Sequence, residues 1–230
     1  MDTDLIETNI RTDLSHHLRN FIRKADFPCV GAKSALANDM LRIVEARDLT
    51  SGWNDLQIHR ELLEWARAYK DDPAGFRSLA VIFHGPDDLD ERAFEAALWD
   101  RIQSLADKDA WKSLPHDPRV SPDPRSPHFS LSFGGEAFFV IGLHPRASRP
   151  ARRFPRPVLV FNLHDQFERL RADGRYERMR TRILARDADL AGSINPMLAR
   201  HGETSEAAQY SGRAVEKDWQ CPYRDPRAGR

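Results

Sequence analysis

Hydrophobic positions in the first part of the chain predict three helices and then a buried strand. Apolar side chains recur at three- and four-residue steps over residues 3–24, which is the pattern of an amphipathic helix. Two more helices are predicted over residues 32–47 and 56–69. Residues 78–83 form a short apolar run bounded by turn residues, and this indicates a buried strand.

Two further helices and a proline-rich loop complete the helical part of the pattern. Asp88 and Glu91 have the spacing of a capping box, which predicts the start of a helix. Residues 114–127 are rich in proline and show no periodicity, so we expect an ordered loop. A helix predicted over residues 165–186 is interrupted near Gly174.

Strand patterns dominate the segment between that loop and the last helix. Residues 128–133 and 136–144 flank Gly134-Gly135, as in a β-hairpin, and residues 157–164 predict a third, adjacent strand. Hairpins pair antiparallel strands. We therefore expect an α+β fold with a central antiparallel sheet, made of the hairpin plus adjacent strands and flanked by helices.

Length and composition favour a single domain over residues 1–230. The chain has 230 residues, of which 40% are hydrophobic and 30% charged, enough to bury a core behind a charged surface. Within this domain we expect an N-terminal helix over residues 3–24 and a frayed tail over residues 224–230.

Charge and the absence of targeting patterns narrow the class of protein. The 35 basic and 35 acidic side chains cancel, which argues against a nucleic-acid partner. No apolar run approaches the roughly 20 residues of a membrane span, and the acidic start does not resemble a signal peptide. Motifs of nucleotide-dependent enzymes, such as GxGxxG or a phosphate-binding loop, are absent from the sequence. We expect a cytoplasmic protein with no membrane partner.

A cysteine precedes the second predicted helix. Cys29 opens the sequence Cys29-Val30-Gly31, where the helix dipole and free N–H groups would stabilise a thiolate. Haem-thiolate enzymes need such a sulfur, and Cys-x-Gly occurs in the haem-ligand loops of the cytochrome P450 and nitric oxide synthase families. The alternative is a buried structural cysteine. The chain has one other cysteine, Cys221, and we expect both to be free thiols.

Histidines at strand ends offer competing ligands. His144 and His164 each end a predicted strand, and neighbouring strand ends would bring both imidazoles into one pocket. Either imidazole could bind haem iron or zinc. Alternatively, each histidine caps its strand or makes a hydrogen bond to a loop.

Arginines cluster after the hairpin. They are interleaved with prolines that stiffen the loop and would aim guanidinium groups at haem propionates or at a substrate carboxylate. A solvated, charge-balanced loop is the alternative. The cluster comprises Arg146, Arg149, Arg152, Arg153 and Arg156.

Several longer segments together resemble the YqcI/YcgG family over residues 26–223. Within it they are similar to the branch that includes the haem-dependent N-hydroxylase of guanitoxin biosynthesis. The segments that carry the resemblance include Phe27-Pro28-Cys29-Val30-Gly31, Phe133-Gly134-Gly135-Glu136, Gly142-Leu143-His144-Pro145, Phe161-Asn162-Leu163-His164-Asp165, Gln209-Tyr210-Ser211-Gly212-Arg213 and Trp219-Gln220-Cys221-Pro222.

This resemblance implies a haem protein with a haem pocket between sheet and helices. The implied activity is that of a haem b monooxygenase that uses O₂ to N-hydroxylate a guanidino group, arginine-like or cyclic, or a related small amine. Electrons would come from an external reductase or other donor, or from peroxide. The alternatives are a non-catalytic haem-binding carrier or sensor, and an α+β domain without a cofactor.

The resemblance also implies roles for particular residues. As iron ligand it favours Cys29, with His144 and Cys221 as alternatives. For catalysis it implies Glu136 and His164. The residues expected to bind a substrate guanidinium are Glu136, Asp165 and Glu168, although the last two also have the positions of helix caps. The residues expected to contact the haem propionates or the haem edge are Arg149, Arg152, Arg153, Tyr210 and Trp219.

Overall fold

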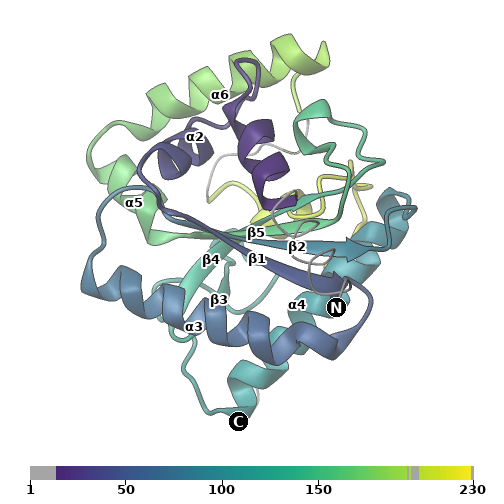
Figure 1. Ribbon diagram of the computed structural model, residues 1–230. Helices are drawn as coiled ribbons and strands as arrows, with labels where there is room; N and C mark the ends of the chain where they lie inside the picture. Colours follow the sequence, from purple (N-terminus) through teal and green to yellow (C-terminus); the bar gives the residue numbers. More distant parts are fainter. Residues whose placement is uncertain (1–13, 196, 198–201, 229–230) are drawn as a thin grey trace, which may run out of the picture.

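The fold, a computed structural model, is built on a five-stranded sheet with helices on both faces (Figure 1). The structure describes residues 14–195, 197 and 202–228. The strands are β1 Leu41–Asp48, β2 Ser78–Gly85, β3 Leu131–Phe133, β4 Glu136–Leu143 and β5 Val158–Leu163, in the spatial order β1-β2-β5-β4-β3. The α-helices with described bounds are α2 Val30–Ala37, α3 Asp55–Asp71, α4 Glu91–Trp111, α5 Asp165–Ala172 and α6 Tyr176–Ala191.

The α+β class is confirmed, but the sheet is mixed. β1 pairs with β2 in parallel, whereas the β2–β5, β5–β4 and β4–β3 pairs are antiparallel. The expected wholly antiparallel sheet is therefore wrong at one edge.

The edge strand β1 was predicted to be helical. The helix expected over residues 32–47 ends at Ala37, where Asn38 hydrogen-bonds back to the carbonyls of Leu36 and Ser34. Asp39 then takes a left-handed backbone conformation with φ of 56°, which an aspartate tolerates better than most residues. The apolar spacing that follows fits either period, and parallel pairing with β2 makes it a strand.

The other elements follow the sequence pattern closely. α3, β2, the hairpin and β5 form where they were predicted. The last long helix is broken into α5 and α6 at Gly174, whose φ is 65°. α4 begins at Glu91 behind Asp90, the residue that caps its N-terminus, so Asp88 is not the cap. Residues 14–23 of the predicted N-terminal helix are helical, and residues 3–13 lie outside the described part.

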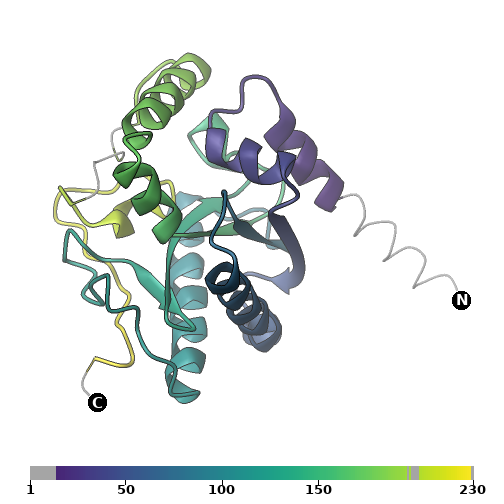
Figure 2. The same cartoon turned by 90° about the vertical axis from the view of Figure 1, so that its left-hand side faces the viewer.

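The helices form two layers of different character. α3 and α4 lie against one face of the sheet, while residues 14–23, α2, α5 and α6 lie over the other (Figures 1 and 2). Along β4 successive side chains alternate between these faces. Phe138 and Val140 join the core with α3 and α4, and Ile141 and Leu143 face the opposite layer.

The C-terminal segment, expected to be frayed from residue 224, is instead held in place as far as residue 228. The backbone N–H of Arg224 donates to Gln103 on α4, and Arg227 pairs with Asp109 on the same helix. Residues 229–230 lie outside the described part. None of the helices that the structure describes is long and apolar enough to span a membrane.

Candidate functional site

A cavity of about 280 Å³ lies between the sheet and the layer of α2, α5 and α6. Its wall is mostly apolar, with side chains such as Leu18, Ile22, Phe76, Ile141, Leu143 and Val160. Of the residues predicted to form the site, the cavity is lined by Cys29, Arg149, Arg152 and His164. A mostly apolar pocket with a few converging polar groups is typical of a small-molecule or cofactor site.

Cys29 is the N-cap of α2, as its position in the sequence predicts. Its Sγ accepts a hydrogen bond from the backbone N–H of Ala32 at 3.4 Å. Burial raises the pKa of the thiol, and the N–H groups of Ala32 and Gly31 and the charge of Arg152 offset this only in part. The sulfur is thus a neutral thiol at neutral pH until a cationic centre binds it.

Arg152 brings a positive charge to the cavity wall without a matching carboxylate among the described residues. Its guanidinium donates to the backbone carbonyls of Tyr210 at 2.9 Å, Gln209 at 2.8 Å and Gly142 at 3.3 Å. Burial lowers its pKa to about 10, so the group stays protonated at neutral pH. Gly212 makes room for it, since a Cβ there would lie 2.8 Å from Arg152 Cδ.

The other two arginines of the predicted set are already engaged. Arg149 forms an ion pair with Asp187 on α6 and donates to Ser193, and so joins the arginine loop to the helical layer. Arg153 is exposed, donates to the carbonyls of Ala147 and Ser148, and does not line the cavity.

His164 lies beside a buried carboxyl that the sequence analysis missed. Nε2 of His164 is 3.9 Å from Oε2 of Glu206, and the other carboxylate oxygen accepts hydrogen bonds from Ser130 at 2.8 Å and from the Tyr210 hydroxyl. Burial raises the pKa of Glu206 to about 8. A pKa perturbed in this way is typical of a functional carboxyl. The only sequence signal was its position four residues before Tyr210.

The two strand-end histidines do not share a pocket, so that expectation is wrong. β4 and β5 are antiparallel, with Leu143 opposite Val158 and Phe138 opposite Leu163. The C-terminus of β4 therefore lies next to the N-terminus of β5, and the two histidines are at opposite ends of this strand pair. His144 is buried against α4, where its ring stacks on Phe94 with centroids 4.3 Å apart. It does not line the cavity.

The carboxylates predicted to bind substrate lie outside the cavity. Glu136 and Asp165 both pair with Arg119, and Asp165 also accepts a hydrogen bond from Tyr69. Glu168 pairs with Arg171 and is 3.9 Å from His164 Nε2. These carboxylates are already matched by cations and hydrogen-bond donors.

The remaining predicted residues pack on the α4 side. Tyr210 is fully buried with its ring 5.5 Å from that of Trp99, and only its hydroxyl reaches Glu206. Trp219 and Cys221 pack against the same core. Burial raises the pKa of Cys221 to about 12. Both cysteines are free, as predicted.

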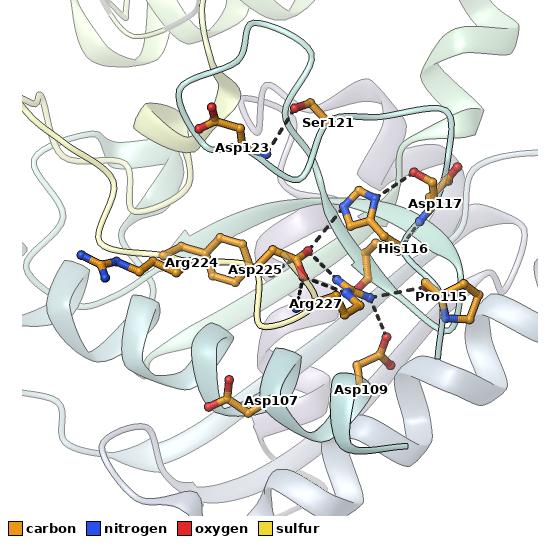
Figure 3. Close-up of polar contacts among 12 residues, drawn as sticks. Asp107, Asp109, Pro115, His116, Asp117, Ser121, Asp123, Arg224, Asp225 and Arg227 are labelled. Carbon is orange, nitrogen blue, oxygen red and sulfur yellow. Dashed lines mark hydrogen bonds and ion pairs between the residues drawn. The ribbon is translucent and has the colours of Figure 1, made fainter. Parts of the chain in front are cut away.

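A separate polar network joins the C-terminus to α4 (Figure 3). Arg227 pairs with Asp109 at 3.0 Å and with Asp225 at 2.8 Å, while His116 lies 3.7 Å from Asp225. Nε2 of His59 also lies 2.8 Å from Oδ1 of Asp109. Both carboxylates pair with Arg227, so this network acts as a structural tie between the C-terminal segment and α4. No group of three or more His, Cys, Asp or Glu side chains placed to hold a metal ion occurs among the described residues.

Comparison with known proteins identifies the family. The chain is 30% identical over 210 residues to a protein of Bacillus subtilis (strain 168) named "Uncharacterized protein YqcI", and 28% identical over 207 residues to "Uncharacterized protein YcgG" of the same organism. Each match covers 86% of this chain and 80% of the relative. No solved structure gives a significant match. The model of the YqcI/YcgG family matches residues 18–224, and the chain therefore belongs to the YqcI/YcgG family.

Proposed function

We propose that this protein is a haem-dependent monooxygenase that N-hydroxylates a small guanidino compound or a related amine. The observation that carries the proposal is the mostly apolar cavity, which combines the Cys29 thiol at a helix N-terminus with the Arg152 guanidinium, which forms no ion pair with a described carboxylate. An apolar wall suits a porphyrin, and a buried cation suits a propionate. The cavity residues thus fit haem b.

Each of these residues has a distinct part in holding the cofactor. Cys29 would bind the haem iron, because a thiolate next to helix N–H groups and near a guanidinium is the best electron donor on the cavity wall. Arg152 would pair with a propionate. Arg149 keeps its link to Asp187 and so positions α6 over the cavity. Haem bound in this way supplies O₂ activation, with electrons from an external donor or from peroxide.

The rest of the chain's contribution is to position the substrate and to control water and protons. Apolar side chains of residues 14–23, α2 and α6 line the cavity and would exclude water once a ligand fills it, which would strengthen every electrostatic interaction inside it. The pair His164 and Glu206 places two proton-exchanging groups on the wall. We further propose that the protein works in the cytoplasm with a separate reductase.

Absorption spectra of the haem-loaded protein test this proposal. The ferrous protein with carbon monoxide should give the strongly red-shifted Soret band of thiolate ligation, and Cys29→Ala should abolish it. Cys221→Ala is the matched control, since this second partly buried cysteine does not line the cavity and should leave the band unchanged. Guanidines would then be screened for N-hydroxylation.

Other spectra would point to other functions. A six-coordinate low-spin ferric spectrum that changes in both Cys29→Ala and His164→Ala would indicate two protein ligands and thus a carrier or sensor. Failure of the wild-type chain to bind haem on titration would eliminate the haem proposal.

A further inference from the structure

Glu206 faces the cavity with half of its carboxyl group unused. Oε1 accepts hydrogen bonds from Ser130 and Tyr210, both buried. Within the described part of the chain, Nε2 of His164 lies 3.9 Å from Oε2, which is too long for a hydrogen bond. Glu206 itself is only 7% exposed, and it lines the cavity.

The charged groups around Glu206 do not neutralise it. From α5, Arg171 favours its ionised form, but Arg171 pairs with Glu168, whose negative charge opposes it. Two neutral hydroxyls also contact Glu206, that of Tyr210 directly after η3 (Glu206–Gln209) and that of Ser130 directly before β3. From α6, Arg180 lines the same cavity. Arg152 bonds to backbone carbonyls.

A buried carboxyl of this kind ionises when a cation arrives. Without one, the apolar surroundings favour the protonated form, which is why its pKa is raised to about 8. Its Oε1 is fixed by two hydroxyl donors, so Oε2 is held in one orientation towards the cavity. A cation beside Oε2 would stabilise the carboxylate and displace the proton.

We infer that Glu206 is the anchor for a small organic cation in the cavity and that binding of the cation releases the carboxyl proton. The inference rests on the proposed function in taking this cavity as the ligand site, and it names the group that recognises the positive end of the ligand. It does not depend on haem. The hydroxyls of Ser130 and Tyr210 position the anchor, and the apolar wall accepts the carbon chain of the ligand.

The test is calorimetry of the full-length chain with n-butylguanidinium, whose charge does not change between pH 6 and pH 9.5. In two buffers of different ionisation enthalpy, binding at pH 7 should release close to one proton, and the release should fall towards zero above pH 9. The affinity should rise about tenfold per pH unit below pH 8 and level off above it. The neutral analogue n-butylurea should bind at least about tenfold more weakly and release no proton.

Variants identify the group that loses the proton. Glu206→Gln keeps an acceptor for Ser130 and Tyr210, so it should fold; it should bind n-butylguanidinium at least about tenfold more weakly and without proton release. Glu203→Gln is the matched control, because Glu203 is exposed and does not line the cavity, and it should behave as wild type. Proton release that persists in Glu206→Gln would assign the proton to His164 and overturn the inference.

Two further outcomes separate this inference from the haem proposal. Equal binding of n-butylguanidinium and n-butylurea, or binding of the cation to wild type without proton release, would overturn the anchor whatever the haem spectrum shows. Cation binding with proton release in a chain that takes up no haem would retain the anchor and remove the oxygenase.

Discussion

The two faces of the sheet are built on opposite principles. On the α3–α4 face, large side chains form one contiguous core, in which the aromatic rings of Phe133, Phe138 and Phe161 lie 6.0–6.4 Å from one another. On the face covered by residues 14–23, α2, α5 and α6, the packing stops short and leaves a cavity of about 280 Å³. Protein interiors are otherwise close-packed, with few voids larger than a water molecule, so this space distinguishes the second face.

The ionisable groups on the two sides differ in the same way. On the α3–α4 side they form matched partners, such as His59 with Asp109 and Arg101 with Asp55. Around the cavity, Arg152 bonds to backbone carbonyls and not to a described carboxylate, and the Oε1 of Glu206 is bound by neutral hydroxyls. The difference teaches that the filled face supports the fold, while the unmatched charges of the cavity face are available to a ligand.

The largest test of this contrast uses two adjacent phenylalanines on β4 that face opposite ways. Phe138 is fully buried in the filled core, whereas Phe139 is partly buried and lines the cavity. Phe138→Ala should lower the free energy of unfolding by about 3–5 kcal/mol. Phe139→Ala should lower it by less than about half as much, because part of its surface has no packing partners to lose. Urea unfolding with unchanged m-values measures both.

Equal losses for the two variants would contradict the contrast. They would mean that the cavity wall is as tightly packed around Phe139 as the core is around Phe138.

Two buried carboxyl groups, those of Glu206 and Asp117, should make the stability depend on pH with opposite signs. Because the pKa of Glu206 is raised to about 8, the folded state holds a proton there that the unfolded state loses above about pH 4.3. Its stabilising contribution is therefore complete in acid and is lost as the pH rises to about 8, at up to about 1.4 kcal/mol per pH unit. Glu206→Gln should remove this slope in urea unfolding measured from pH 5 to pH 8.

Asp117, in the loop between α4 and β3, provides the comparison. Burial alone would raise its pKa, but hydrogen bonds from Arg119 lower the pKa overall. Its stabilising contribution is present above its ordinary pKa and is lost on acidification below about pH 4. A wild-type stability that stayed flat from pH 5 to pH 8 and matched that of Glu206→Gln would contradict the burial of an unpaired carboxyl.

Local sequence patterns predicted most of the fold because most elements have one clear hydrophobic period. β2 is a continuous apolar run, and Gly134-Gly135 marks the hairpin; both formed as predicted. The prediction for β1 was wrong because the spacing of its buried residues Leu41, Val44 and Ala46 fits a helix as well as a strand. Only the pairing of β1 with β2, in which Leu41 lies opposite Ser78, decides between the two periods.

Glycines on the two faces should also respond differently to alanine. A Cβ at Gly142 would lie 2.6 Å from the Phe94 ring and 2.9 Å from Leu98, both on α4. Gly142→Ala should therefore lower the thermal midpoint, with a loss of about 1–3 kcal/mol through overpacking. At Gly31, in α2, the nearest atom is 3.3 Å away on the Phe76 ring, which lines the cavity and can move. Gly31→Ala should be neutral or stabilising, because alanine favours the helix. A large loss at Gly31 would contradict free space beside Phe76.

The site was predicted less completely than the fold, for a reason of the same kind. Cys29 and Arg152 were identified by local motifs, and the structure places both on the cavity wall. His144 and His164 were expected to share one pocket. Neighbouring antiparallel strands, however, have their C-termini at opposite ends of the pair, which separates these two residues. Glu206 was missed because a buried carboxyl is recognised by its surroundings, which come from three distant segments.

The smallest expected effect separates the structural and chemical roles of Cys29. Asp90 caps α4 through a hydrogen bond of 2.8 Å from the Ala93 N–H, and Asp90→Ala should lower the free energy of unfolding by about 1 kcal/mol. The sulfur of Cys29 caps α2 at 3.4 Å, a weak acceptor at long range, so Cys29→Ala should change it by less than about 0.5 kcal/mol. Urea unfolding of the two variants without haem makes this comparison. If Cys29→Ala loses as much free energy of unfolding as Asp90→Ala, Cys29 is a structural cap. If the loss in Cys29→Ala is negligible, the fold around the cavity is unchanged. Any loss of haem binding in this variant then reports ligation by Cys29.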